Sequence, residues 1–258
     1  MKIFIRFSFF GQSYYGTQKL PKYKTIQGEF ESLLSRIYAS NIKVTISSRL
    51  DRGVHALDFA ITFTPTNEDI SIEHLEYYLK RSVSKDICIK KVCKIDDSFS
   101  PRYDCLDKQY LYIIQNTSNP NPLLNSISFT PKKVLNVSQL KETIEMFKGI
   151  HDFSSFCSKE GDENTLLEVK ETSLEQNGDL IFIRFKAKAF LRYQIRFMVG
   201  SAISVCLGYM TIEEIKNSLA GKSETHIKFK AEPQGLILEK INYPQIEDDF
   251  TTKQIILF

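Results

Sequence analysis

Tryptophan is absent from this 258-residue chain, and cysteine and histidine, with five and four residues, are scarce. The cysteines are scattered without a Cys-x-x-Cys pair and the histidines lie far apart, which argues against a disulfide framework or a zinc site. We expect the cysteines to be free and buried. The chain has no glycine-rich phosphate loop and no apolar run long enough to cross a bilayer. These absences favour a cytoplasmic protein without a metal site.

Aromatic residues are abundant, with 19 phenylalanines and 12 tyrosines to fill a core. Its hydrophobic content of 42% and charged content of 25% are ordinary for a soluble globular protein. The length fits one large domain or two modest ones. A net charge of +3 permits a nucleic-acid partner without arguing for one, so the distribution of the charges matters more than their sum.

Hydrophobic periodicity predicts alternating strands and helices in the first half of the chain. Thr25 precedes an amphipathic run and fits the N-cap of its helix. The expected order is strand, helix, strand, strand, helix, strand, over residues 2–9, 26–39, 42–46, 57–64, 71–83 and 87–95. This order is typical of a ferredoxin-like unit. The polar segment that follows predicts a lobe boundary, with an N-terminal lobe at 1–103 and a C-terminal lobe at 104–258.

The second half also mixes strands and helices, which predicts an α+β fold made of two lobes. Asn136 with Gln139 forms a capping-box pattern, as does Thr211 with Glu214. The expected strands cover residues 108–115, 166–175, 180–189 and 235–243, with an Asn-Gly turn at 177–178. The expected helices cover residues 136–147, 191–207 and 212–220, and a further edge segment is expected at 253–258.

One acidic residue lies between cations in a turn that separates two apolar runs. Asp51 is flanked by Arg49 and Arg52 in residues 47–57, SSRLDRGVHAL. An aspartate in a turn often only accepts hydrogen bonds from neighbouring backbone amides. The alternative is a reactive carboxylate kept ionised by the cations, because an opposite charge nearby lowers a carboxylate pKa. Without a second acid or a metal, such a group suits nucleophilic catalysis or charge stabilisation.

Cations also recur where a predicted strand leads into an apolar helix. They are Arg184, Lys186 and Lys188 on one strand face, then Arg192 and Arg196 one helical turn apart. Such a stripe is typical either of a surface that binds a phosphate backbone or of a solvated sheet face. Arg196 lies deep in the apolar helix, where an unpaired guanidinium is costly. We therefore expect it to pair with a carboxylate, for which Asp51 is a candidate.

Two tyrosines alternate with apolar residues in the predicted strand at 108–115. Tyr110 and Tyr112 fit the usual place of aromatic residues on a sheet face. The functional alternative is a ring that stacks on a nucleobase, with a hydroxyl available for proton transfer.

Together these segments resemble the TruA-type tRNA pseudouridine synthase family. The catalytic-loop pattern G-R-T-D-x-G-V-H-A of that family is similar to residues 48–56, SRLDRGVHA, and its R-Y-x-Y-x-I strand to residues 109–114. Further matches are G-x-x-Y-x-G-W-Q at 11–18, T-V-Q at 25–27, F-x-x-R at 99–102, H-D-F-x-S-F at 151–156, the A-F-L helix start at 189–200 and G-L-x-L at 235–238. Each motif is weak alone, but the ordered set is specific. The chain departs from the pattern at Thr17 for Trp, Ser48 for Gly, Leu50 for Thr and Gln194 for Met.

The resemblance implies a role for each matched site residue. Asp51 is the essential acid that helps to detach uracil from its ribose before the ring turns and reattaches through carbon 5. Arg49 takes the place of the uridine that is flipped from its stack, at a cost of a few kcal/mol. Tyr110 stacks against uracil and takes part in removing the C5 proton, while Arg196 pairs with the catalytic carboxylate. The residues expected to line the base pocket are Leu236 and Leu238. No cofactor or metal is required.

The resemblance also implies the architecture and the partners. We expect two ferredoxin-like, RRM-like lobes with mainly antiparallel sheets that meet at a central catalytic cleft, in a homodimer that modifies positions 38–40 of the tRNA anticodon stem-loop. The expected contacts to the RNA backbone are Arg184, Lys186, Lys188, Arg192, Lys80, Arg81 and Lys85. Two alternatives stay open because of the departures: a synthase of the same fold that acts on another RNA, and a catalytically silent RNA-binding paralogue.

Overall fold

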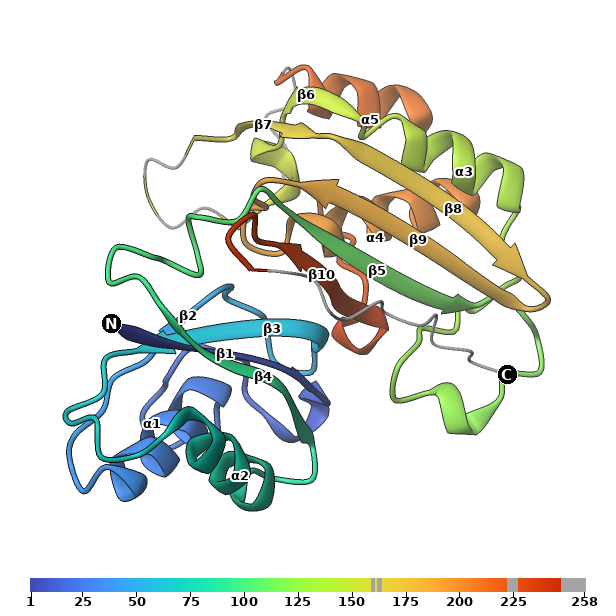
Figure 1. Cartoon of the computed structure of the whole chain (residues 1–258). Coiled ribbons are helices and arrows are strands. Elements are labelled where there is room, and N and C mark those ends of the chain that lie inside the picture. The colour runs from blue at the N-terminus through green and yellow to red at the C-terminus, as the bar shows by residue number, and fades with distance from the viewer. Residues whose placement is uncertain (159–160, 162–163, 222–226, 247–258) are drawn as a thin grey trace.

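One large sheet runs through the molecule. The computed structural model describes residues 1–158, 161, 164–221 and 227–246. The sheet has eight strands in the order β4-β1-β3-β10-β5-β9-β8, with β2 attached to β3, and β6 pairs with β7 separately (Figure 1). The strands are β1 (Lys2–Phe9), β2 (Thr45–Ile46), β3 (His55–Phe63), β4 (Ile87–Ile95), β5 (Asp107–Gln115), β6 (Gly149–Asp152), β7 (Leu166–Val169), β8 (Glu171–Asn177), β9 (Leu180–Ala187) and β10 (Leu236–Asn242).

Helices lie against the strands of each half of the chain (Figure 1). They are α1 (Ile26–Ile37), α2 (Ile72–Ser82), α3 (Val137–Glu145), α4 (Gln194–Cys206) and α5 (Ile212–Leu219). Among the named strands, only β3 and β10 pair in parallel. The predicted α+β fold with a mainly antiparallel sheet is therefore confirmed, as is the β-α-β-β-α-β order of the first half. The division into lobes at residues 1–103 and 104–258 stays a prediction.

Local sequence explains the first helix and its limits. Thr25 caps α1, because its hydroxyl accepts a hydrogen bond from the Gly28 N–H at 3.2 Å. Phe30 on the buried face of α1 packs on Phe7 of β1, with ring centroids 4.5 Å apart. The helix ends two residues before the predicted end, and Ala39 has a left-handed φ of 47° that no helix interior accommodates.

The predicted strand at 42–46 is shortened to the two residues of β2. The reason is that side chains of α1 take over the backbone hydrogen bonds of the missing part. The Ile42 N–H donates to the Ser35 hydroxyl at 2.9 Å, and the Val44 carbonyl accepts from the Gln27 side-chain amide at 3.2 Å. A strand needs a ladder of backbone partners, and residues 42–44 have other ones.

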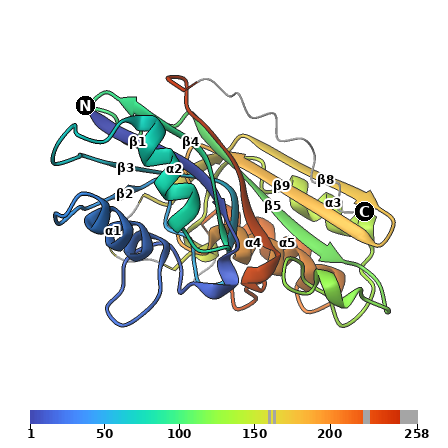
Figure 2. The ribbon, with the colours of Figure 1, turned by 60° about the horizontal axis from the view of Figure 1, so that its bottom comes forward.

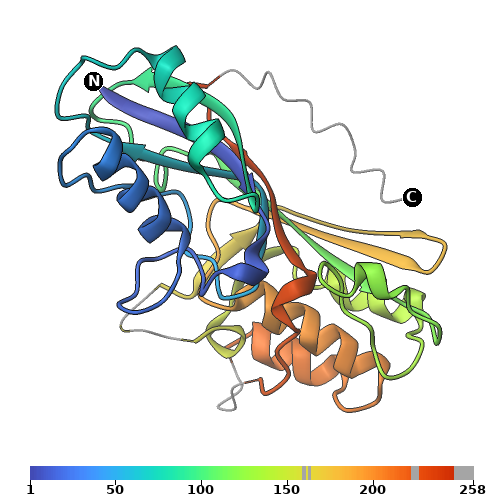
Figure 3. The same ribbon diagram turned by 90° about the horizontal axis from the view of Figure 1, so that it is seen from below.

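The same edge of β3 serves two partner strands, and this places the loop with Asp51. β2 pairs with the C-terminal end of β3 at Ile61 and Thr62, whereas β10 pairs with its N-terminal end at His55 and Ala56. The loop at residues 47–54 connects β2 to β3, so it ends where β10 enters the sheet. Two views show β10 running between the strands of the two halves (Figures 2 and 3).

Two of the predicted elements in the second half differ from the structure. The strand expected at 166–175 is divided at Lys170, since β7 pairs with β6 and β8 pairs with β9 in the main sheet. Helix α4 begins at Gln194 instead of residue 191, because Tyr193 has a left-handed φ of 63°. The capping box at Thr211 and the turn before β9 are as predicted, whereas Asn136 caps α3 by accepting from the Gln139 N–H without the reciprocal bond of a capping box. The segment expected at 253–258 lies outside the described residues.

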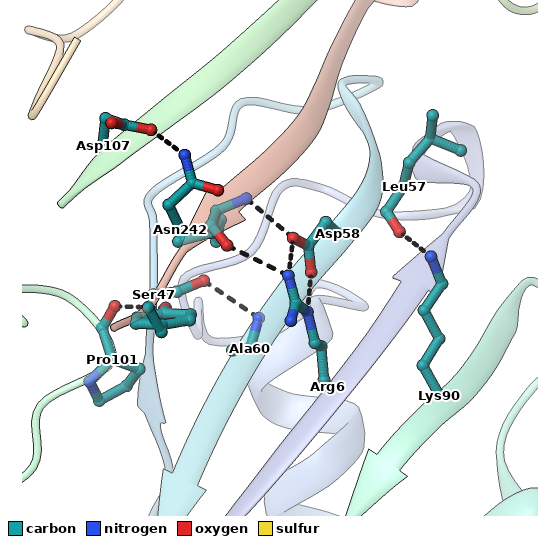
Figure 4. A network of polar contacts seen from close by, with 11 residues as sticks. Arg6, Ser47, Leu57, Asp58, Ala60, Lys90, Pro101, Asp107 and Asn242 are labelled. Atoms are coloured by element: carbon teal, nitrogen blue, oxygen red, sulfur yellow. Dashed lines mark hydrogen bonds and ion pairs between the residues drawn. The ribbon is translucent and has the colours of Figure 1, made fainter. Parts of the chain in front are cut away.

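A buried ion pair fastens β10 to the N-terminal strands (Figure 4). Arg6 of β1 donates to both carboxylate oxygens of Asp58 on β3, at 2.5 and 2.6 Å. Asp58 accepts from the Ile241 N–H at 2.8 Å, and Arg6 donates to the Ile241 carbonyl at 3.1 Å. The pairing of β10 with β3 stops at Leu238, so these side chains replace the ladder hydrogen bonds that β10 no longer makes there.

All five cysteines are free, but burial varies among them. Cys105 and Cys157 are buried as expected, Cys93 and Cys206 are only partly buried, and Cys88 is exposed. The expectation is wrong for Cys88 because β4 alternates, with Ile87 and Ile89 turned into the core and Cys88 turned outward. Among the described residues, none of the helices has the length and apolar character needed to traverse a membrane.

Candidate active site

Asp51 lies in a tight turn at the end of the loop between β2 and β3. The Val54 N–H donates to the Asp51 carbonyl at 3.2 Å, which closes the turn. Gly53 in this turn has a φ of 81°, a left-handed conformation that glycine adopts without the steric cost of a Cβ. The turn thus presents the side chain of Asp51 while its own backbone stays hydrogen-bonded.

Asp51 is paired with Arg196 of α4, as predicted from the apolar character of that helix. Arg196 Nη1 donates to Asp51 Oδ2 at 3.0 Å, and Arg196 Nε donates to the Ala231 carbonyl at 2.8 Å. The Arg196 side chain is 10% exposed and the Asp51 side chain 24% exposed. The guanidinium is therefore held in place from two sides, whereas the carboxylate keeps some contact with water.

The pKa of Asp51 is raised above its usual value, which corrects the expectation of a lowered one. Burial is the largest cause, because removal from water disfavours the charged form of a carboxylate. The attraction of Arg196, Arg192 and Lys230 opposes this effect without overcoming it. Three cations around one half-buried acid thus limit the cost of its charge, and the site holds a carboxylate that is more basic than an exposed one.

Tyr110 of β5 lies near this carboxylate. Its ring packs edge-on against Phe190, with centroids 5.2 Å apart. Burial raises the pKa of its phenol, and Ser48 and Asp51 are among the groups that act on it. Leu238 lies opposite Tyr110 in the pairing of β10 with β5, so both side chains share one sheet face. The phenol therefore keeps its proton at neutral pH.

The strand that carries the two predicted pocket leucines needs a glycine at its start. Leu236 and Leu238 of β10 are buried on the sheet face that also carries Tyr110 of β5. A Cβ at Gly235 would lie 2.7 Å from the ring of Tyr112, so only glycine permits this approach. Tyr112 is fixed in turn, because its hydroxyl donates to the Glu232 carbonyl at 2.8 Å. This explains the glycine of the G-L-x-L motif as a packing requirement.

Comparison with known proteins gives this geometry a family. Residues 143–244 match the family model described as tRNA pseudouridine synthase. The tRNA pseudouridine synthase A of Aquifex aeolicus (strain VF5) is 38% identical over 237 residues, which are 92% of this chain and 97% of that protein. This chain belongs to the TruA-type tRNA pseudouridine synthase family.

Other members of the pseudouridine synthase family are similar over their whole lengths. The proteins named tRNA pseudouridine synthase A from Dictyoglomus turgidum and Staphylococcus aureus (strain MRSA252) are 34% and 28% identical. Each match covers 93% of this chain, with 98% and 91% of the relatives. Among solved structures, a chain of a Cbf5-Nop10-Gar1 complex has a TM-score of 0.36 and 11% identity over 76% of this chain and 44% of its own, too distant to carry an argument.

The predicted basic stripe is not one continuous surface in this pseudouridine synthase family member. Arg184 lies opposite Leu111 in the pairing of β9 with β5, whereas Tyr110 lies opposite Phe185, so Arg184 and Tyr110 are on opposite sheet faces. Arg184 pairs with Glu239 and Glu175, and Lys186 on its face pairs with Glu171 at 3.0 Å. These contacts fit the alternative of a solvated sheet face. The interpretation of one stripe for all five cations is therefore wrong, because Arg184 and Lys186 lie on the sheet face opposite Tyr110, whereas Arg196 of α4 pairs with Asp51.

The other predicted RNA-contact residues lie in several places. Arg49 is exposed on the loop two residues before Asp51, and Arg192 is exposed in the turn before α4. Lys188 is exposed beyond the end of β9. The remaining predicted contacts lie on or just after α2, where Lys80 pairs with Glu76, Arg81 lies over a tyrosine ring and Lys85 is exposed. Their roles toward RNA stay predictions.

Tyr193 and Lys230 belong to the site but were missed by the sequence reasoning. The Lys230 ammonium lies 4.0 Å from the centre of the Tyr193 ring, and the guanidinium groups of Arg192 and Arg196 lie 4.9 and 5.5 Å from it. The Ala231 N–H donates to the Arg196 carbonyl at 2.9 Å, which brings this segment to α4. Nothing in the sequence near residue 230 indicates that contact, since it depends on two distant segments meeting.

Thr17 holds the loop that carries Asp51 and was recognised only as a departure from the family pattern. Its hydroxyl donates to the Ser48 carbonyl at 2.9 Å and accepts from the Leu50 N–H at 2.8 Å. Its own N–H donates to the Leu50 carbonyl at 3.1 Å, and its side chain is fully buried. Leu50, where the family pattern has threonine, packs into the core. The Thr17 hydroxyl thus binds the loop backbone on both sides of Arg49.

His55 fastens the other end of the same loop. Its Nδ1 accepts from the Gly11 N–H at 2.9 Å, and its Nε2 lies 2.9 Å from the Ser126 carbonyl. Burial lowers the pKa of His55 to about 4. The ring is therefore neutral, with its proton on Nε2, and it links the loop to two distant segments. Among the described residues, no three His, Cys, Asp or Glu side chains are grouped as metal ligands.

Proposed function

We propose that this protein isomerises uridine to pseudouridine in tRNA, with Asp51 as the essential carboxylate. The observation that carries the proposal is the pairing of Asp51 with the buried Arg196 across a distance of 145 residues in sequence. Such a pair holds the carboxylate in one orientation, as a nucleophile or a charge-stabilising group requires. Family membership and the names of the relatives support the substrate.

The reaction breaks the bond between uracil N1 and the ribose, turns the ring and joins carbon 5 to the ribose. N1 gains a proton and C5 loses one, so the reaction is redox-neutral and conserves the number of bonds. Asp51 acts in its ionised form, either by adding covalently to the uridine or by promoting elimination. Arg196 orients it and stabilises its charge in a half-buried place, where the interaction is stronger than in water.

Tyr110 is proposed to stack against the uracil ring. Its buried phenol has a raised pKa and keeps its proton, which makes it a weak base in the resting enzyme. This favours stacking as its main role, with proton removal at C5 dependent on a second acceptor. Arg49 on the same loop as Asp51 is proposed to fill the place of the flipped base, while Leu236 and Leu238 support the pocket behind Tyr110.

The finer target is proposed as positions 38–40 of the anticodon stem-loop, with a homodimer as the active assembly in the cytoplasm. The TruA-type motifs carry this part of the proposal. Pseudouridine mapping on total RNA from cells with and without the gene tests it, because only the true target loses its modification. Sites in another RNA would support the alternative of a different target, and light scattering on the purified protein tests the dimer.

The central test is Asp51→Asn, which removes the carboxylate charge at nearly constant volume. We expect the variant to fold and to bind tRNA but to release no tritium from tRNA labelled at uridine C5. Asp97→Asn is the matched control, because Asp97 is an exposed acid away from the loop. Normal turnover by Asp51→Asn would sink the proposal. Salt-sensitive tRNA binding without tritium release by the wild type would instead support a silent RNA-binding protein.

A further inference from the structure

Three exposed side chains form a stack beside the catalytic loop. The rings of Tyr15 and Tyr23 are stacked, with centroids 4.4 Å apart and an interplanar angle of 28°. The Arg52 guanidinium lies 4.2 Å from the centre of the Tyr15 ring. Tyr15 is 41% exposed and Tyr23 is 52% exposed. Tyr15 is the middle member, so Tyr23 and Arg52 are the two ends of the stack.

The stack is attached to the loop that carries the proposed catalytic acid. Arg52 directly follows Asp51 in the chain. The Tyr15 N–H donates to the Lys24 carbonyl at 2.8 Å, which closes the segment 15–24 into a loop. Thr17 then joins this segment to the catalytic loop through its hydrogen bonds with Leu50. The stack and the carboxylate are therefore parts of one hydrogen-bonded unit.

The charge around the stack suits a polyanion. Residues 14–24, YYGTQKLPKYK, contain three lysines and no acid, and Arg52 adds a fourth cation. Lys19 is paired with Glu31 at 2.7 Å and Lys24 lies 3.9 Å from Glu29, whereas Lys22 is exposed. Aromatic rings interleaved with cations on an exposed loop are the usual means of holding single-stranded nucleic acid, because bases stack while the backbone meets positive charge.

Base flipping creates a need for such a surface. When a uridine leaves its stack, the neighbouring bases are unstacked at a cost, and stacking groups on the enzyme beyond Arg49 offset that cost. We propose that Tyr23 and Arg52 stack on the RNA bases that adjoin the target uridine, so that residues 15–24 and Arg52 form a second RNA-binding surface. This inference rests on the proposed function. The surface is tolerant of sequence, because every base has a π face, and it adds binding strength without selecting one base.

The test uses fluorescence from the neighbouring base itself. The RNA is a stem-loop that the wild type modifies, with 2-aminopurine placed on the 5′ or the 3′ side of the target uridine in two separate molecules. Binding by the wild type quenches at least one of them, since stacking on an aromatic ring quenches 2-aminopurine. Tyr23→Leu abolishes that quench and weakens binding by about fivefold or more, the lower end of what one base–aromatic stack contributes.

A second exposed cluster provides the matched control. Tyr77 and Tyr78 of α2 are 55% and 50% exposed, and the Arg81 guanidinium lies 5.4 Å from the Tyr77 ring. Helix α2 packs on β4, which is separated from β3 and its loop by β1. The Tyr77→Leu/Tyr78→Leu variant therefore removes similar aromatic surface far along the sheet. It retains the quench of the wild type, which is the control readout, because Arg81 beside Tyr77 is itself a predicted RNA contact.

Two failures are distinguishable. If the wild type releases tritium but Tyr23→Leu keeps the full quench, or if neither labelled base is quenched, the stack only packs its own loop and the inference is refuted while the proposed function stands. If the wild type releases no tritium from any tRNA, the proposed function fails whatever the fluorescence shows. Unchanged thermal melting of Tyr23→Leu confirms that a lost quench reports the contact, because the ring is half exposed.

Discussion

The hydroxyl of Thr17 offers a sharp test of how the catalytic loop is held. Thr17→Val keeps the shape of the side chain but removes one donated and one accepted hydrogen bond. The Ser48 carbonyl and the Leu50 N–H then lose their partner in a fully buried place. Each unpaired buried group costs about 1–3 kcal/mol, so we expect the free energy of unfolding to fall by about 2–6 kcal/mol. Urea denaturation measures this loss.

The same substitution should impair catalysis more than RNA binding. Leu50 directly precedes Asp51, and a displacement of about 1 Å at a reacting group costs on the order of 100-fold in rate. Single-turnover tritium release at saturating tRNA should therefore fall by about tenfold or more, while the dissociation constant for tRNA stays near that of the wild type. Thr17→Ser retains the hydroxyl and should restore most of the rate.

The matched control is Thr143→Val in α3. Thr143 is also fully buried, and its hydroxyl donates to the Gln139 carbonyl at 2.8 Å within its own helix. This variant loses a partly buried side-chain hydrogen bond in another element and should keep the rate of the wild type. A wild-type rate for Thr17→Val, or an equal loss of rate in Thr143→Val, would refute the reasoning that this hydroxyl positions Asp51.

Three further perturbations test the electrostatics of the site. Arg196→Met should abolish tritium release and lower the free energy of unfolding by about 2 kcal/mol or more. This loss is smaller than for a fully buried pair, because Asp51 keeps contact with water. Unchanged melting and rate would contradict the prediction. Arg192→Gln should raise the pKa of Asp51 and shift the acid limb of the kcat/KM profile to higher pH, whereas Arg184→Gln on the other sheet face should not. His55 protonates near pH 6.5 when unfolded but near 4 when folded, so stability should fall by about 3 kcal/mol as pH drops between these values, and His55→Gln should flatten that slope in pH-dependent melts.

Features that depend on a few neighbouring residues were predictable from the sequence. The Thr25 cap and the capping box of Thr211 with Glu214 are local contacts. Where prediction failed, a distant partner decided. The strand at 42–46 shrank because α1 supplies side-chain partners, and the strand at 166–175 divided because two different strands pair with its halves.

The candidate site shows the same division. Asp51, Tyr110 and Arg196 stood out in the sequence, because an acid between cations and an arginine in an apolar helix both need an explanation. The raised pKa of Asp51 was not visible in the sequence, because burial is a property of the packed molecule and here outweighs the effect of three nearby cations. In the sequence, Thr17 stood out only because the family pattern has tryptophan at this position. Its three hydrogen bonds to the loop form only when the two segments pack together.

By itself, the sequence determined the order of the elements in the first half of the chain, the family and the residues with chemistry, because short-range periodicity, caps and motif spacing are encoded in adjacent positions. The tertiary structure decided which of those residues meet. Strand alternation placed Arg184 and Lys186 on the sheet face away from Tyr110, and the entry of β10 beside β3 brought Lys230 and Arg196 to Asp51. Such contacts join segments more than 100 residues apart, and only the packed sheet and helices bring them together.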